Sequence, residues 1–409
     1  MSSLLDGIRV VESASLLNGD RLGAILGDLG ADVVKVEHPS RGDYLRDFIG
    51  QITPHHSPAH VQVNKQKRSL TLDLGRDLGR EVFWKLLATA DVFVDGHMPG
   101  AAAKLGISYD EQRARRPEIV YCQCTGYGST GPYSAVPPHG QMMTALAGGL
   151  PVVTDEDGWV RPGDQRSSLH PLGAGDGTAV AAVHAAAYVC AALVHRDRTG
   201  RGSFIDVAGA DAVVANGWLT ITNRLNADRI TDRSTMPVTG GGDGAKYQFY
   251  ETKDGRYVVF CAIEHRYWDA FCVGVGREDL RERKDTRAPV DFAPGETGLR
   301  RELQSIFLER TLEEWMGFAR ERSLPIGPIV NQVDELRGEP HLESRGLFVE
   351  GSHPHAGPFT YLRESGGVAD DAYVVRHPAP LLGEHTDEIL AELGYEHDSV
   401  EELRSLDVV

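Results

Sequence analysis

Short apolar strands alternate with helices along the first third of the chain, and this alternation constrains the fold more than any other feature. Residues 8–37 hold a strand, a helix and a second strand, the βαβ order in which the two strands lie parallel. The same spacing predicts strands at 8–12, 33–37, 92–95 and 119–124, and helices at 21–29, 78–87 and 109–115. We therefore expect an α/β fold, with a Rossmann-like large domain built on a parallel sheet.

A change of composition near residue 224 marks a second domain. Residues 224–244 are polar and end in a run of glycines, which is typical of a linker or loop. Beyond them, the dipeptide Asp254-Gly255 between two apolar runs predicts a β-hairpin. The expected organisation is a large domain at 1–224, a smaller α+β domain at 225–335, and a C-terminal segment at 336–409 that returns to the large domain.

Composition argues against several classes of partner. The chain has 409 residues and a formal net charge of −17, and a negative field opposes binding to nucleic acid or to an anionic membrane surface. Five scattered cysteines indicate thiols in a reducing cytoplasm, and Cys122-x-Cys124 lacks the second pair that a zinc site needs. We expect a cytoplasmic protein that binds neither nucleic acid, nor a membrane, nor a metal.

Two segments bear on phosphate recognition. Residues 64–73 carry three cations, Lys65, Lys67 and Arg68, which predict either a solvated basic loop or a phosphate-binding site. The first strand-to-helix turn, at 13–20, has no G-x-G-x-x-G sequence, so a nicotinamide or flavin dinucleotide site is not indicated.

His139 and Asp176 are candidate chemical groups near predicted helix starts. Residues 131–149 follow a glycine-rich turn, and two prolines fix the backbone just before His139. A helix start favours a neutral imidazole that can act as a general base; the alternative is a capping or solvated histidine. Asp176 precedes a long alanine-rich helix, where an aspartate most often serves as the helix cap.

Several phrases, in order along the chain, resemble the family III CoA-transferases, a group that also contains the α-methylacyl-CoA racemases. One of them is Asp-Leu-Gly-Ala-Asp-Val-Val-Lys-Val-Glu at 28–37, and the matches extend from residue 5 to about 395. The others lie at 42–43, 64–74, 99–106, 125–132, 196–206 and 381–386.

The resemblance implies an interlocked homodimer with the active site at the interface between subunits. CoA would enter as part of an acyl-CoA thioester substrate, so no prosthetic group is implied. The positions that match the family's CoA-binding residues are His38, Leu72, Gly96, His97, Met98 and Lys104. Some depart from the family pattern, because His38 stands where an arginine is frequent and Gly96-His97-Met98 replaces Asn-Phe-Arg.

The resemblance also implies two possible chemistries. Racemases use an aspartate as one base and a histidine as the second base, and the matching residues here are Asp176 and His139. A glutamate supports that histidine, and the matching residue here is Glu264. Because all three positions are filled, the resemblance favours a racemase or epimerase that inverts the α-carbon of 2-methyl-branched acyl-CoA thioesters by two-base proton transfer.

The alternative chemistry is CoA transfer between carboxylic acids, with a free carboxylic acid as acceptor. In transferases the same aspartate attacks the thioester and forms an acyl anhydride. Gly140 stands where the racemases carry an acidic residue. The altered CoA-binding positions, and a triple glycine at 240–242 that is similar to a loop of some transferases, keep this alternative open. A third possibility is a non-catalytic subunit that binds CoA esters without turnover.

Overall fold

The chain divides into two compact units in the computed structural model, which describes residues 4–162, 176–232, 244–283, 289–367 and 373–409. We call them the large unit, Met1–Ile221 with Ser344–Val409, and the small unit, Thr222–Glu343. The divisions after Ile221 and Glu343 fall near the predicted ones after residues 224 and 335.

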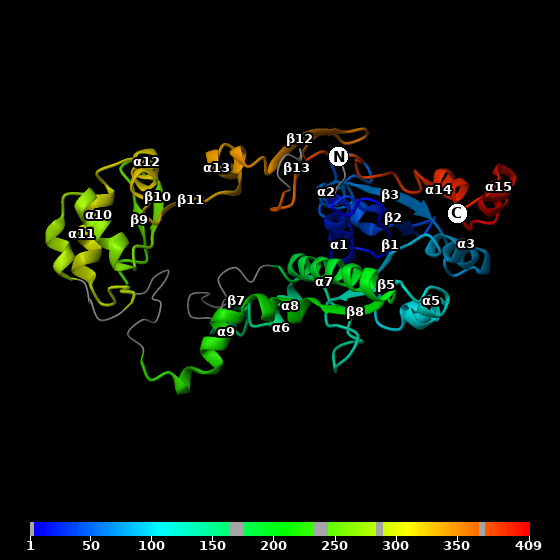
Figure 1. Cartoon of the computed structure of the whole chain (residues 1–409), viewed down its shortest axis with the longest axis horizontal. Helices are drawn as coiled ribbons and strands as arrows, with labels where there is room; N and C mark the ends of the chain where they lie inside the picture. Colours follow the sequence, from blue (N-terminus) through cyan, green and yellow to red (C-terminus); the bar gives the residue numbers. More distant parts are fainter. Residues whose placement is uncertain (1–3, 163–175, 233–243, 284–288, 368–372) are drawn as a thin grey trace. The chain divides into compact units, whose positions relative to one another are not determined.

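A six-stranded parallel sheet, in the order β3-β2-β1-β4-β5-β8, forms the centre of the large unit. The predicted α/β fold with a parallel sheet is therefore confirmed. The chain starts in the middle of the sheet and adds strands first on one side and then on the other (Figure 1). Open sheets of this kind bind ligands at the carboxyl ends of the strands beside the point where the order reverses, here β1 and β4. The strands are β1 (Arg9–Ser13), β2 (Asp32–Glu37), β3 (Lys67–Thr71), β4 (Val92–Asp95), β5 (Val120–Thr125) and β8 (Ser203–Ala208).

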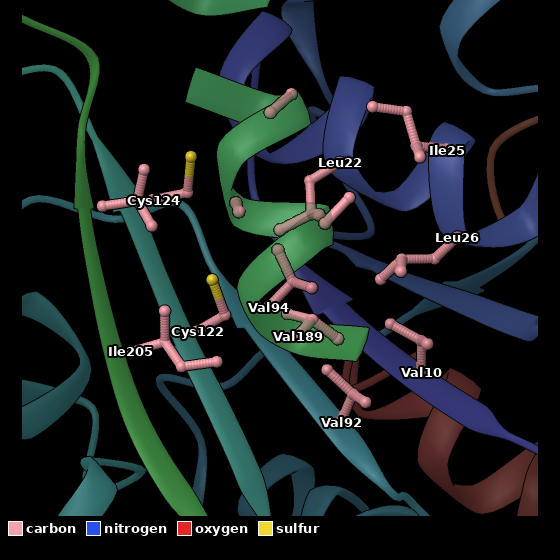
Figure 2. Close-up of a cluster of buried hydrophobic side chains, with 14 of the residues drawn as sticks. Val10, Leu22, Ile25, Leu26, Val92, Val94, Cys122, Cys124, Val189 and Ile205 are labelled. Atoms are coloured by element: carbon pink, nitrogen blue, oxygen red, sulfur yellow. The ribbon is translucent and has the colours of Figure 1, made fainter. Parts of the chain in front are cut away.

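Helices cover both faces of this sheet because its strands are apolar on both sides. On one face, α1 (Leu17–Asp28) and α7 (Gly177–Thr199) pack against Val10, Val94 and Cys122 (Figure 2). Cys122 and Cys124 belong to this core, as predicted from their spacing on one strand. The opposite face is covered by α3 (Asp77–Leu87), α5 (Tyr109–Arg115), α14 (Thr386–Glu392) and α15 (His397–Ser405).

Helix α7 is apolar along most of its length, up to the polar residues of its last turns. It is the one helix of the described residues that is long and apolar enough to cross a membrane, with 44% of the tested window buried inside the protein. Ala181, Ala185 and Val189 are fully buried in the core, so packing against the sheet already accounts for much of this composition. Val183, Tyr188 and Val194 remain exposed on its other side.

The segment at 381–386 covers the β3 edge of the sheet. The backbone N–H of His385 donates to the carbonyl oxygen of Ser69 at 3.0 Å, and the N–H of Thr71 donates to Thr386 Oγ1 at 3.1 Å. These bonds satisfy polar groups along β3 that an edge strand otherwise leaves open to other chains. The C-terminal segment is thus part of the large unit.

The remaining elements of the large unit are short. The predicted helical run after His139 is confirmed as α6 (Gln141–Leu146). The segment at 152–162 contains the hairpin of β6 (Val152–Thr154) and β7 (Val160–Pro162). The others are α2 (Pro58–Val63), α4 (Ala101–Lys104), α8 (Gly209–Asn216), α9 (Trp218–Leu225, which runs into the small unit), β12 (Phe348–His353) and β13 (Gly357–Leu362).

The small unit is an antiparallel sheet packed against helices. The predicted hairpin is confirmed, because β9 (Gln248–Glu251) pairs with β10 (Tyr257–Phe260) across Asp254-Gly255. Gly255 has a φ of +71°, which glycine adopts without strain. An aromatic core that includes Phe260, Phe271 and Trp315 joins the sheet to its helices. The other elements are β11 (Ile326–Ile329), α10 (His265–Gly274), α11 (Thr297–Phe307), α12 (Leu312–Arg322) and α13 (Pro340–Ser344).

The three cations at 65–68 form neither a solvated loop nor a phosphate site, so both predictions for them were wrong. Lys65 and Lys67 are fully buried, and Arg68 is 7% exposed. Lys65 pairs with Asp28, while Lys67 Nζ lies 2.9 Å from Glu12 Oε1. Lys67 and Arg68 are successive residues of β3, so their side chains point to opposite faces of the sheet, and each forms ion pairs there.

Lys35 is the centre of a buried charge cluster beneath the carboxyl end of β1. Its ammonium group donates to Glu12 Oε1 at 3.1 Å, to Asp43 Oδ2 at 3.0 Å, to Asp20, and to the carbonyl oxygen of Ala14 at 3.1 Å. Burial alone would lower the pKa of Lys35, but Asp20, Asp43 and Glu12 together hold it well above its usual value. The cluster therefore keeps a permanent cation inside the protein.

We expect the free energy of unfolding to fall as the pH drops below 6.5, partly because of buried His60. Its Nε2 accepts a hydrogen bond from Arg46 at 3.1 Å, so a proton there would place two cations in contact. Burial, with Arg46 and Lys35, lowers the pKa of His60 to about 2 from 6.5. Below pH 6.5 this histidine binds a proton in the unfolded chain but stays neutral in the folded protein. The free energy of unfolding therefore falls by at most about 1.4 kcal/mol per pH unit.

Urea unfolding of the wild type and His60→Gln at pH 7.0, 6.0 and 5.0 measures this contribution. Glutamine keeps a hydrogen-bond acceptor for Arg46 but does not titrate, so the variant should lose less stability between pH 6.0 and 5.0. Equal losses in the two proteins would show that His60 does not contribute.

Candidate functional site

The predicted CoA-binding residues lie along one edge of the sheet, at the carboxyl ends of β2, β3 and β4. His38 follows β2 and is partly exposed, with its Nε2 3.9 Å from Asp73 Oδ1. Leu72 follows β3, but its side chain is 2% exposed and belongs to the core, so only its main chain is offered at the edge. Met98 is half-buried, and Lys104 is exposed at the last position of α4.

His97 is held in a fixed orientation by a buried carboxylate. Asp95, the last residue of β4, has its Oδ1 2.9 Å from His97 Nδ1, and it accepts from the backbone N–H of His97 at the same distance. The other ring nitrogen, Nε2, lies 3.5 Å from Ser13 Oγ at the end of β1. The hydroxyl of Tyr121 also donates to Asp95, at 2.5 Å. An imidazole anchored in this way can present one nitrogen to a polar ligand.

The turn after β1 approaches this edge closely. A Cβ at Gly96 would lie 2.5 Å from the Cβ of Ala14, so only glycine fits there. Leu16 has a φ of +64°, which is uncommon for leucine, and its N–H lies 3.2 and 3.3 Å from the carboxylate oxygens of Asp43. Asp43 is bound in turn to Lys35, so the buried charge cluster fixes the turn beside Gly96 and His97.

A cavity of about 350 Å³ adjoins two of the predicted residues. Pro39 and Thr71, which line it, are the chain neighbours of His38 and Leu72. The cavity is also lined by the segment at 381–386 that covers the β3 edge and by residues near the C-terminus. These lining residues are Leu382, Gly383, Thr386, Arg404 and Val409.

Asp176 caps helix α7, as the simpler interpretation of the sequence predicted. Its Oδ1 accepts from the N–H of Thr178 at 2.9 Å and of Ala179 at 3.4 Å, and also from the Thr178 hydroxyl. The carboxylate is exposed at the end of a helix of 23 residues. The positive end of the helix dipole favours negative charge at this position.

His139 lies two residues before α6, exposed to solvent. Its backbone N–H lies 3.4 Å from Met142 Sδ, and its carbonyl oxygen accepts from the Met142 N–H. Its ring makes no hydrogen bond with the described residues. Both α6 and the first turn of α7 belong to the large unit, where they pack against α8.

Glu264 is placed in the small unit, at the N-terminal cap position of α10, and is half-buried. Because His139 belongs to the large unit, the predicted pairing of the two side chains stays a prediction. Among the described residues no group of three or more His, Cys, Asp or Glu side chains is placed to hold a metal ion.

The sequence analysis did not single out Ser13, Asp95 or the role of Asp43. A usable signal existed for Asp95, because it is the polar residue that ends a predicted strand of a parallel sheet. No pattern in the sequence links Asp43 to Lys35 and Leu16, since that contact depends on the packing of three segments.

Comparisons with known proteins agree with the resemblance to the family III CoA-transferases. Residues 5–386 match the model of CoA-transferase family III. The chain is 30% identical over 405 residues to succinyl-CoA:glutarate CoA-transferase of Mus musculus, covering 98% of this chain and 88% of that one. It is 28% identical over 435 residues to formyl-CoA:oxalate CoA-transferase of Rhodopseudomonas palustris, covering 98% and 96%.

Solved structures agree with these matches. A CAIB/BAIF family protein from Brucella suis is similar with a TM-score of 0.70 and 26% identity, covering 96% of this chain and 100% of that one. A hypothetical protein from Mycobacterium tuberculosis gives a TM-score of 0.74 at 26% identity, with 95% and 99% covered.

The chain has an α/β sheet of this order and is similar over nearly its whole length to enzymes that act on CoA esters. It is therefore an enzyme that acts on CoA thioesters. The chain belongs to CoA-transferase family III. The relatives from Mus musculus and Rhodopseudomonas palustris are both named CoA-transferases, so the comparisons support the predicted alternative better than the racemase that the sequence analysis favoured.

Proposed function

We propose that this protein transfers CoA from an acyl-CoA thioester to a free carboxylic acid. The observation that carries the proposal is the whole-length similarity to enzymes named as CoA-transferases. Each name contains a short dicarboxylic acid, namely succinate, glutarate or oxalate. We therefore propose a short dicarboxylic acid as donor, acceptor or both.

Asp176 is the proposed nucleophile. Its carboxylate attacks the thioester carbonyl carbon, the carbon–sulfur bond breaks, and CoA leaves as a thiolate, so that the acyl group and Asp176 form a mixed anhydride. The thiolate then attacks the Asp176 carbonyl, which releases the donor acid and leaves an aspartyl-CoA thioester. The acceptor carboxylate repeats the first step on this thioester, and the thiolate then takes up the acceptor acyl group and frees Asp176.

The position of Asp176 suits this role. The N–H groups of Thr178 and Ala179 hold Oδ1, which orients the carboxylate at the end of α7. The same helix end favours the negative charge that develops on a carbonyl oxygen under attack. His38, Leu72, Gly96, His97, Met98 and Lys104 would bind the CoA portion at the sheet edge, with CoA as part of the substrate and no prosthetic group.

A homodimer is also proposed. Exposed apolar side chains continue from α7 onto α8 and α9, and Tyr188, Val214 and Trp218 are 60%, 42% and 64% exposed. Large apolar side chains left exposed on neighbouring helices are frequent where subunits meet. The interlocked form of the dimer and the cytoplasmic location rest on the family resemblance and on the cysteine content.

Substitution of His139 distinguishes CoA transfer from racemisation, because only racemisation needs this residue as a base. We expect His139→Ala to reduce CoA transfer less than about tenfold, since general bases contribute about 100- to 10,000-fold only where they move the reacting proton. Steady-state assays of CoA transfer and of α-proton exchange on the same preparation measure both activities. Loss of proton exchange with intact transfer in the variant would reveal a racemase activity beside transfer.

A further inference from the structure

Met143 fills a socket lined by glycines at the start of α7. Its side chain is 1% exposed. A Cβ placed on Gly209 would lie 2.3 Å from Met143 Sδ, and one on Gly177 would lie 2.7 Å from Met143 Cβ. A Cβ on Gly126 would lie 3.3 Å from the same sulfur. Gly209 and Gly177 therefore permit an approach to Met143 that a larger residue would push apart, whereas a Cβ on Gly126 would first meet Pro138, at 2.3 Å.

These glycines belong to the three elements that meet beside Asp176. Gly177 is the first residue of α7 and follows Asp176 directly, Gly209 is the first residue of α8, and Gly126 follows β5. Met143 itself lies on α6, four residues after His139. One side chain thus contacts the first turn of the helix that carries Asp176 and holds the segment that carries His139.

We propose that Met143 is a positioning residue for Asp176. It acts by setting how far the first turn of α7 lies from α6 and α8, and hence where the Asp176 carboxylate meets the thioester. The proposal rests on the proposed transfer reaction. A displacement of about 1 Å at a reacting group can reduce a rate by about 100-fold.

The two glycine contacts differ in a way that allows a sharp test. The severe clash expected from Gly209→Ala is with the end of the Met143 side chain, which Met143→Ala removes, and the contact that remains is with the carbonyl oxygen of Gly177 at 3.2 Å. The clash expected from Gly177→Ala is with Met143 Cβ, which Met143→Ala retains. Rescue should therefore occur for one glycine and not for the other.

We expect Gly209→Ala to lower kcat for CoA transfer by about 10- to 100-fold, with the KM for acyl-CoA changed less than about threefold. Met143→Leu, which preserves volume, should retain at least a third of the wild-type kcat. Gly209→Ala with Met143→Ala should recover most of the kcat lost in Gly209→Ala, relative to Met143→Ala alone. Gly177→Ala with Met143→Ala should recover none.

Gly317→Ala is the matched control, because Gly317 is also helical and a Cβ there meets nothing within 4 Å. Thermal unfolding of each variant confirms that it is folded. The inference is overturned if Gly209→Ala keeps the kcat of the control, if both double variants behave alike, or if KM rises while kcat is unchanged. A wild-type enzyme that transfers CoA to no acid would instead overturn the proposed function, and this inference with it.

Discussion

Replacing Asp176 with asparagine is expected to abolish CoA transfer while leaving the fold intact. An amide cannot form the anhydride, and removal of a covalent nucleophile lowers turnover by about 1,000-fold or more. Asparagine still caps a helix as well as aspartate does. Rates of CoA transfer and urea unfolding curves, measured on the same preparation, separate the loss of chemistry from a loss of structure.

Asp176→Ala provides the matched control. It removes both the nucleophile and the hydrogen bonds to the N–H groups of Thr178 and Ala179. We expect about 1 kcal/mol of destabilisation in addition to inactivity. An Asp176→Asn protein that transfers CoA at more than a tenth of the wild-type rate would show that Asp176 only caps the helix.

Replacing Lys35 with methionine is expected to destabilise the large unit by about 3–5 kcal/mol, because it leaves buried carboxylates without their cation. Glu12, Asp20 and Asp43 all lie within hydrogen-bond distance of the Lys35 ammonium, and the side chain is fully buried. Methionine has nearly the same length, so the loss reports the charge more than the packing. Urea unfolding at pH 7 measures it.

Arg404→Met is the matched control for this prediction. Arg404 pairs with Asp387, but the two side chains are 44% and 70% exposed, and such pairs contribute about 0–1 kcal/mol. Equal effects of the two substitutions would contradict the account of the buried charge cluster.

The parallel sheet could be predicted from the sequence because its strands are apolar on both faces. Val10 and Val11 point to opposite cores, and runs of this kind separated by helical periods have few other solutions. The hairpin at Asp254-Gly255 was likewise predictable, since the dipeptide has a local conformational preference.

Strand β3 could not be recognised in this way. Its sequence, KRSLT, is mostly polar, because its lysine and arginine are buried in ion pairs with residues far along the chain, such as Glu12 and Glu392. A cation with a distant partner has the same local pattern as a solvated one. The three cations were therefore predicted to form a solvated loop or a phosphate-binding site.

The sequence indicated where the candidate site residues lie in the fold, but not which residues they contact. The sequence placed His97 and Asp176 at the end of a strand and at the start of a helix, and both lie there. It could not show that Asp95 holds the His97 ring or that Met143 packs on Gly177, because those contacts join segments that only the folded chain brings together.

Mass spectrometry of the CoA esters formed in heavy water tests the central claim most directly. The protein is incubated with succinyl-CoA or with 2-methylacyl-CoA, with and without glutarate or oxalate. CoA transfer predicts a new CoA ester of the added acid, release of the donor acid, and no deuterium at the α-carbon. Deuterium at the α-carbon of 2-methylacyl-CoA, without any new CoA ester, would contradict the transferase and restore the two-base racemase.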